Sequence, residues 1–243
     1  MEQETVIRPI AVIHTDFPEK FGIPRQAGII DELRGEIVFE PEYRREEALR
    51  GLEAFTHIWL IWQFSENREK GWTPTVRPPR LGGNVRLGVF ATRSPFRPNA
   101  LGLSCVRLLG IRQDPERGPV LRVAGADLMD GTPIFDIKPY IPYADCRPEA
   151  SGGFAPDPGA TLRVSIPPEL EEKIPEEKRA ALRGILANDP RPRYQEDPER
   201  RYGLSFGGME IAFHVCGAEL QVTEVEMASQ RTGKENGKTE SGI

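Results

Sequence analysis

The chain has 243 residues, of which 38% are hydrophobic and 28% charged, and its formal net charge is −5. This length and composition fit one large domain or two modest domains of a globular protein. No apolar run approaches the roughly 20 residues that span a membrane, and the acidic start MEQETVIRPI lacks the pattern of a secretory signal. We therefore expect a cytoplasmic protein with no membrane partner.

Short β-strands separated by turn signals are predicted across the first 145 residues. They are rich in Val, Ile, Phe and Trp, which favour a half-buried pleated surface. One helical turn is predicted at 45–55. Few helices alternate with the strands, which argues against a doubly wound parallel sheet and favours a closed or nearly closed barrel. The predicted strands cover residues 6–14, 35–39, 57–64, 85–91, 103–111, 120–126 and 132–138.

A second, smaller α+β domain is predicted at 162–227, after a Gly-, Pro- and Ser-rich linker at 146–161. Its helix spans 175–189, where Pro175 suits the first position and three large apolar residues share one face. The predicted strands of this domain are 163–167 and the hairpin 209–215 and 219–225. We thus expect a mainly β protein, with a β-barrel domain at 5–145 and a disordered polar tail at 228–243.

Positive charge is concentrated in one part of this acidic chain. Residues 71–113 contain seven arginines and no acid, a net charge of +7, whereas 1–70 and 114–243 carry −5 and −7. Such a segment can attract an anionic partner although the whole molecule is acidic.

Five of these arginines lie in the stretch RPPRLGGNVRLGVFATRSPFRPNALG, residues 77–102. Its prolines and glycines exclude an amphipathic helix and place the arginines on turns around one short strand. Guanidinium groups on an ordered loop suit phosphate and carboxylate, because each can donate two parallel hydrogen bonds. A solvated loop explains the pattern equally well, so charge alone leaves both interpretations open.

Two further loops stand out. In GIPRQAG, residues 22–28, an arginine and a glutamine follow a proline, which is typical of a turn or of a binding loop. In ADLMDGTPIFDIKPY, residues 126–140, carboxylates surround a tight turn. They either supply turn geometry or form a cluster for a cation or an amino group. These carboxylates are Asp127, Asp130 and Asp136.

Several common sites are not predicted. The three cysteines and three histidines lack metal-ligand spacing, so we expect no metal site and structural roles for these residues. The nucleophile elbow, the phosphate-binding P-loop and the dinucleotide fingerprint are all missing. The residues by themselves therefore predict a β-rich scaffold that binds a polyanion and a small molecule, without specifying a reaction.

Four long motifs, in this order, resemble the TrmO, or TsaA-like, family of tRNA methyltransferases. They are GIPRQAG, GLEAFTHIWLIWQF, RPPRLGGNVRLGVFATRSPFRPNALGLS and DLMDGTPIFDIKPY. The later NDPRPRYQ (188–195) and RYG (201–203) are similar to the family's C-terminal domain. The resemblance covers roughly residues 5–225.

The resemblance implies a homodimeric enzyme with a single-sheet β-barrel domain and a cofactor site near the subunit contact. Such an enzyme uses S-adenosylmethionine to methylate N6 of threonylcarbamoyladenosine at position 37, beside the tRNA anticodon. The cofactor contacts carried over from the family are Pro24, Arg25, Gln26, Ser65, Glu66, Arg93, Leu103, Leu128, Met129, Asp130 and Gly131.

Two of these positions depart from the family. Many members have His-Gln where this chain has Ser65 and Glu66. The departure keeps an alternative open, a non-catalytic module that binds S-adenosylmethionine or RNA.

For the enzyme, we expect Arg93 or Arg97 to stabilise charge that develops on N6, while in-line alignment supplies the rest of catalysis. No residue is a convincing general base. Phosphates of the tRNA would be held by arginines and a lysine, and Tyr140 would stack on a base. The predicted tRNA-binding residues are Arg77, Arg80, Arg86, Arg97, Lys138, Tyr140, Arg191 and Arg193.

Overall fold

The computed structural model describes residues 5–67, 71–191, 197 and 199–228. Six antiparallel strands form a closed barrel in the order β1-β2-β7-β6-β3-β8, which confirms the predicted mainly β fold. The barrel strands are β1 (Ala11–Thr15), β2 (Arg34–Phe39), β3 (His57–Gln63), β6 (Leu101–Asp114), β7 (Gly118–Ala124) and β8 (Thr132–Pro139).

Alternating side chains fill the barrel. Ile58, Leu60 and Trp62 of β3 are buried, while the residues between them are half-buried. This period-2 pattern is what a strand with one core face requires. β6 has 14 residues, and it pairs with β3 through its first half and with β7 through its second half. Its register shifts between Leu108 and Gly110, which is typical of a bulge that bends a strand.

The segment 85–91 was predicted as one strand, and this prediction is wrong. It contains only β5 (Leu87–Gly88), which pairs with β4 (Thr75–Val76), followed by the 3-10 turn η5 (Val89–Ala91). The Val89 carbonyl accepts hydrogen bonds from the Thr92 hydroxyl and the Arg97 guanidinium. Because the Val89 carbonyl is used in these contacts, it is not available for pairing in a longer strand, and the chain turns here.

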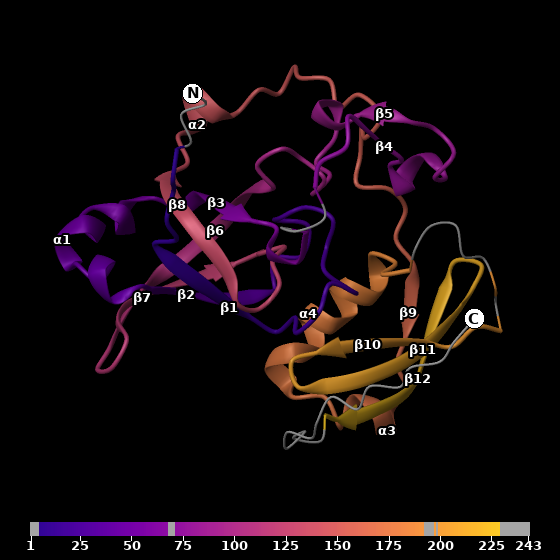
Figure 1. Cartoon of the computed structure of the whole chain (residues 1–243). Helices are drawn as coiled ribbons and strands as arrows, with labels where there is room; N and C mark the ends of the chain where they lie inside the picture. The colour runs from indigo at the N-terminus through magenta and orange to yellow at the C-terminus, as the bar shows by residue number, and fades with distance from the viewer. Residues whose placement is uncertain (1–4, 68–70, 192–196, 198, 229–243) are drawn as a thin grey trace, which may run out of the picture.

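The segments between and after the barrel strands contain short helical elements. They contain the helices α1 (Glu46–Leu49) and α2 (Pro142–Asp145) and the 3-10 turns η1 (Pro41–Tyr43), η2 (Leu52–Ala54), η3 (Ser65–Asn67) and η4 (Pro79–Leu81). Figure 1 shows α1 at one end of the barrel and the β4–β5 flap, residues 72–91, on the opposite side of the molecule.

The C-terminal region forms a second sheet, in the order β10-β11-β12-β9, with two helices packed on it. Its elements are β9 (Arg163–Ser165), α3 (Pro168–Glu171), α4 (Glu176–Ala187), β10 (Tyr202–Phe206), β11 (Met209–Cys216) and β12 (Glu219–Met227). The hairpin β11–β12 agrees with the sequence pattern; β10 and α3 were not predicted. Pro175 is the N-cap of α4 rather than its first residue.

Figure 1 shows α4 lying between the barrel and the C-terminal sheet. Leu182, Ile185 and Leu186, the predicted apolar face of α4, are fully or almost fully buried. The bounds 5–145, 146–161 and 162–227 stay a prediction, and the predicted tail lies outside the described residues apart from Ala228.

Candidate functional site

A cavity of about 440 Å³ opens beside one end of the barrel. Four segments that are distant in sequence line it, within 20–26, 62–66, 92–103 and 127–132. Its volume lies in the range of sites for small ligands. Within the described residues, every lining position belongs to the N-terminal 132 residues.

The cavity brings together nine of the eleven residues that the family resemblance assigns to the cofactor. They are Pro24, Arg25, Gln26, Ser65, Glu66, Arg93, Leu103, Leu128 and Met129. Asp130 and Gly131 do not line it. Lys20, Trp62, Phe64 and Asp127 line the cavity although no cofactor role was predicted for them.

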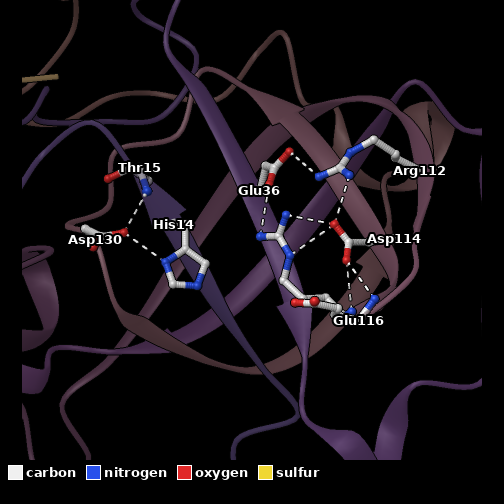
Figure 2. Close-up of polar contacts among 8 residues, drawn as sticks. His14, Thr15, Glu36, Arg112, Asp114, Glu116 and Asp130 are labelled. Atoms are coloured by element: carbon white, nitrogen blue, oxygen red, sulfur yellow. Dashed lines mark hydrogen bonds and ion pairs between the residues drawn. The ribbon is translucent and has the colours of Figure 1, made fainter.

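Asp130 faces the first strand instead of the cavity. Its carboxylate accepts a hydrogen bond from the Thr15 amide at 3.1 Å and lies 3.1 Å from Nδ1 of His14 (Figure 2). Its own amide donates to the carbonyl of Phe17 at 2.8 Å. Asp130 therefore joins the turn before β8 to the end of β1.

Asp127 is the most buried carboxylate at the cavity. Its Oδ1 accepts a 2.6 Å hydrogen bond from the Ser104 hydroxyl, which in turn accepts one from the Trp62 indole at 2.9 Å. Burial raises the pKa of Asp127, although the Ser104 hydrogen bond and the charge of Arg93 act in the opposite direction. Its place directly after the strand predicted at 120–126 is the sequence signal that sets it apart from Asp130.

Arg93 and Gln26 connect two walls of the cavity, since the Arg93 guanidinium donates a hydrogen bond to the Gln26 side-chain oxygen. Both residues line the cavity and come from loops 67 positions apart. Arg93 is exposed as well as lining the cavity.

Arg97 has a different environment. Its guanidinium donates to the carbonyls of Val89 and Thr92, at 3.2 and 2.6 Å, and lies 5.8 Å from the ring centroid of Phe90. These contacts close the turn that presents Phe90, whose exposed fraction is 73%. Arg97 lines the cavity, and its Nη1 donates to two carbonyls of this turn.

The predicted tRNA-binding residues fall into two groups. Arg77 and Arg86 are exposed on the β4–β5 flap, where Arg86 donates to the Thr75 hydroxyl. The others that the structure describes, apart from Arg97, are engaged within the molecule: Arg80 with Asp157, Lys138 with Asp136, Arg191 with Asp189, and Tyr140 against the rings of Trp59 and His57. Arg193 lies outside the described residues.

The described part of the chain contains no cluster of three His, Cys, Asp or Glu side chains that could hold a metal ion. A structural role predicts buried or half-buried cysteines. Cys105 is half-buried in agreement, whereas Cys146 and Cys216 are exposed. Among the described helices, none is long and apolar enough to cross a membrane.

The arrangement suits a small zwitterionic ligand with an aromatic part. Arg25 and Arg93 offer cationic donors for a carboxylate, Asp127 and Glu66 offer carboxylates for a cation, and Trp62, Phe64 and Leu128 supply an apolar wall.

Two family models match the chain. The tRNA-methyltransferase O N-terminal domain matches residues 12–146, and the TrmO C-terminal domain matches residues 159–228.

Relatives match over nearly the whole length. An Escherichia coli (strain K12) protein named tRNA (adenine(37)-N6)-methyltransferase is 42% identical over 226 residues, covering 89% of this chain and 96% of the relative. A Pseudomonas aeruginosa protein named putative S-adenosylmethionine-dependent methyltransferase RcsF is 42% identical, covering 88% of this chain and 94% of the relative. The crystal structure of TrmO from Pseudomonas aeruginosa has a TM-score of 0.76 and 33% identity, covering 92% of this chain and 99% of that one.

Proposed function

The chain belongs to the tRNA-methyltransferase O (TrmO) family, and from this premise we propose that it methylates N6 of threonylcarbamoyladenosine at position 37 of tRNA, with S-adenosylmethionine as methyl donor. The observation that carries the proposal is the cavity, where nine of the predicted cofactor residues meet from separate segments. The names of relatives as an adenine(37)-N6-methyltransferase and an S-adenosylmethionine-dependent methyltransferase support it.

The donor set of the cavity fits S-adenosylmethionine. This cofactor carries a carboxylate, an ammonium, a sulfonium and an adenine, and when bound it supplies an electrophilic methyl group. We assign its carboxylate to Arg25 and Arg93, its cationic groups to Asp127 and Glu66, and its adenine to the apolar wall. Asp127 thereby takes the role that the family resemblance implies for Asp130.

Two arginines have distinct roles in this proposal. Arg93 is exposed, and we assign its positive charge to the stabilisation of negative charge on N6 while that nitrogen passes its proton to water and takes the methyl group, which leaves a neutral thioether on the cofactor. Arg97 positions the 89–97 turn through its two backbone hydrogen bonds. The target N6–H lies between a purine and a carbonyl, which makes it more acidic than an ordinary adenine N–H, and alignment provides much of the remaining rate.

We assign the tRNA phosphates mainly to Arg77 and Arg86 of the β4–β5 flap. Exposed Trp72 and Phe90 lie on the same segment, and aromatic faces next to arginines suit unpaired bases of an anticodon loop. Arg80, Lys138 and Arg191 already pair with carboxylates, so we expect smaller contributions from them.

A homodimer that acts in the cytoplasm completes the proposal. Leu103, which is 52% exposed, lines the cavity. A subunit contact here would cover apolar surface beside the cofactor.

One observation favours a second function. Ser65 and Glu66, which replace the His-Gln of many relatives, both line the cavity. A changed contact at this place is compatible with a module that binds S-adenosylmethionine or RNA without catalysis.

Radiolabelled S-adenosylmethionine distinguishes the two functions. The purified protein is given threonine-type tRNA with and without the threonylcarbamoyl group on position 37. We expect label only on the modified tRNA. Label on neither tRNA, together with measurable cofactor binding, would instead support the non-catalytic module.

A further inference from the structure

The loop between β1 and β2, residues 16–33, belongs to two parts of the molecule at once. Its central residues Ile23, Pro24, Arg25 and Gln26 line the cavity. Other residues of the same loop are part of the hydrophobic core of the C-terminal sheet and α4. Ile23 does both, since it lines the cavity and packs against that core, whereas no described residue after position 132 lines the cavity.

The apolar residues of this loop are buried as deeply as core residues. Phe17, Ile30 and Leu33 are 1%, 3% and 3% exposed, in one cluster with α4 and β10. The Phe17 ring packs against the Phe206 ring with centroids 5.3 Å apart. Such contacts fix the loop to the C-terminal domain. Backbone hydrogen bonds also join it to the barrel side, from the Gly28 amide to the Gly125 carbonyl at 2.8 Å and from the Gly125 amide to the Leu33 carbonyl at 2.9 Å.

Close backbone approaches add to this packing. A Cβ atom on Gly22 would lie 2.2 Å from Cδ1 of Leu204 in β10, and one on Gly184 in α4 would lie 2.7 Å from Cγ2 of Ile30. The loop therefore meets both α4 and β10 without space for another methyl group.

Polar contacts fix the start of the loop. Nζ of Lys178, on α4, lies 2.5 Å from Oδ1 of Asp16, and both side chains are mostly shielded from solvent. The amide of Gly207, after β10, donates to the Asp16 carbonyl at 2.8 Å. Asp16 precedes the cavity-lining part of the loop by only a few residues.

We propose that the C-terminal domain is a structural part of the cofactor site: α4 and β10 hold the β1–β2 loop in the conformation that forms one wall of the cavity. Lys178 is then a positioning residue for S-adenosylmethionine although it does not line the cavity. The inference rests on the proposed function, because it takes S-adenosylmethionine as the ligand. By linkage, the cofactor in turn stabilises α4 and β10.

The matched test uses two ion pairs of the same helix. Lys178 pairs with Asp16 of the loop, whereas Arg183 pairs with Glu171 inside the C-terminal domain, at 2.8 Å. In Lys178→Met, we expect the Kd for S-adenosylmethionine, measured by calorimetry on the full chain without tRNA, to rise about three- to tenfold. In Arg183→Met it stays within about twofold of wild type. Lys178→Arg restores most of the affinity because it keeps the charge.

Measurements with tRNA distinguish a positioning role of Lys178 from general damage to the fold. The KM for S-adenosylmethionine rises in Lys178→Met, while the Kd for tRNA measured without cofactor is unchanged. Equal losses in Lys178→Met and Arg183→Met, or no loss in Lys178→Met, would overturn the inference. Failure of the wild-type protein to bind S-adenosylmethionine would instead overturn the proposed function.

A second measurement needs no variant. Hydrogen exchange of the wild-type protein is followed with and without S-adenosylmethionine. We expect the cofactor to slow amide exchange in α4 and β10 as well as in the β1–β2 loop. Slowing confined to residues of the barrel and the loop would contradict the coupling, even if Lys178→Met does not fold.

Discussion

Asp127 and Asp130 are three positions apart in sequence, but their carboxylates have different neighbours. Asp127 lies at the cavity and is held by Ser104, whereas Asp130 turns toward His14 and Thr15 (Figure 2). A side chain's direction within a tight turn decides which carboxylate meets a bound ligand. The two residues therefore provide a test with a matched control.

In Asp127→Asn, we expect the Kd for S-adenosylmethionine to rise about tenfold or more, since a hydrogen bond to a charged group contributes about 1.5–3 kcal/mol. Asp130→Asn should change it by less than about threefold. Because burial raises the pKa of Asp127, wild-type affinity should also fall as the pH is lowered through that pKa, and Asp127→Asn should lack this dependence. A larger effect of Asp130→Asn in the same titration would return the cofactor role to Asp130.

Asp114 gives a prediction about stability and pH. Arg117 and Arg112 surround its carboxylate at the end of the β6–β7 hairpin, next to Glu36 (Figure 2). Hydrogen bonds from Arg117, through its side chain and its amide, hold the pKa of Asp114 well below its ordinary value. A lowered pKa stabilises the folded state above the unfolded-state pKa of about 3.9, and this stabilisation is lost as the pH falls through the lower folded-state pKa.

We therefore expect Asp114→Asn to lower the Tm at pH 7, and the difference from wild type to shrink below about pH 4. Glu53→Gln, at an exposed carboxylate of η2, serves as the control and should differ little from wild type. A constant Tm difference between pH 7 and pH 3 would show that charge on Asp114 is not the cause.

At the scale of elements, strands β3 and β6 come very close together where Gly102 meets Trp62. A Cβ atom on Gly102 of β6 would lie 2.3 Å from Cε2 of Trp62 in β3. Trp62 is 8% exposed and donates to Ser104, which holds Asp127, so its position affects both the barrel core and the cavity.

We expect Gly102→Ala to reduce the free energy of unfolding by about 1–3 kcal/mol, because overpacking displaces the indole. It should also weaken S-adenosylmethionine binding, measured by calorimetry. Gly203→Ala in β10 is the control, since a Cβ there meets no atom within 4 Å. If Gly102→Ala binds the cofactor with wild-type affinity, the Trp62–Ser104–Asp127 contacts do not shape the cofactor site.

At the scale of the whole molecule, charge is separated. The net charge is −5, yet residues 71–113 carry seven arginines and no acid. Figure 1 shows the β4–β5 flap, which carries Arg77 and Arg86, far from α1. In the proposed function, a focused positive region of this kind would direct tRNA to one side of the molecule.

We expect the double variant Arg77→Ala/Arg86→Ala to bind tRNA more weakly and to lower the slope of log K against log salt by about one to two. Arg50→Ala, at the end of α1, should leave affinity and slope unchanged. The measurement is a binding titration between about 50 and 200 mM salt. An unchanged slope in the double variant would place the phosphate contacts elsewhere.

Much of the architecture follows from local pattern. The alternation in HIWLIWQF predicts β3, and the apolar face of 175–189 predicts α4. Periods of two and 3.6 residues can be recognised from residues that are close in sequence. Most of the residues that line the cavity also lie within the four family motifs. The strand predicted at 85–91 failed because side chains of Thr92 and Arg97 compete for a backbone acceptor, a contact that periodicity does not report.

The sequence by itself determined the strand-rich barrel, the helix of the second domain and the family's cofactor motifs. Only the tertiary structure decided that Asp127 rather than Asp130 lines the cavity, that Arg97 and Arg191 are already engaged, and that the β1–β2 loop joins the C-terminal core. The physical reason is the range of the contacts. Periodicity reflects neighbours within a few positions, whereas Asp16 and Lys178 are 162 residues apart and meet only when both domains have folded.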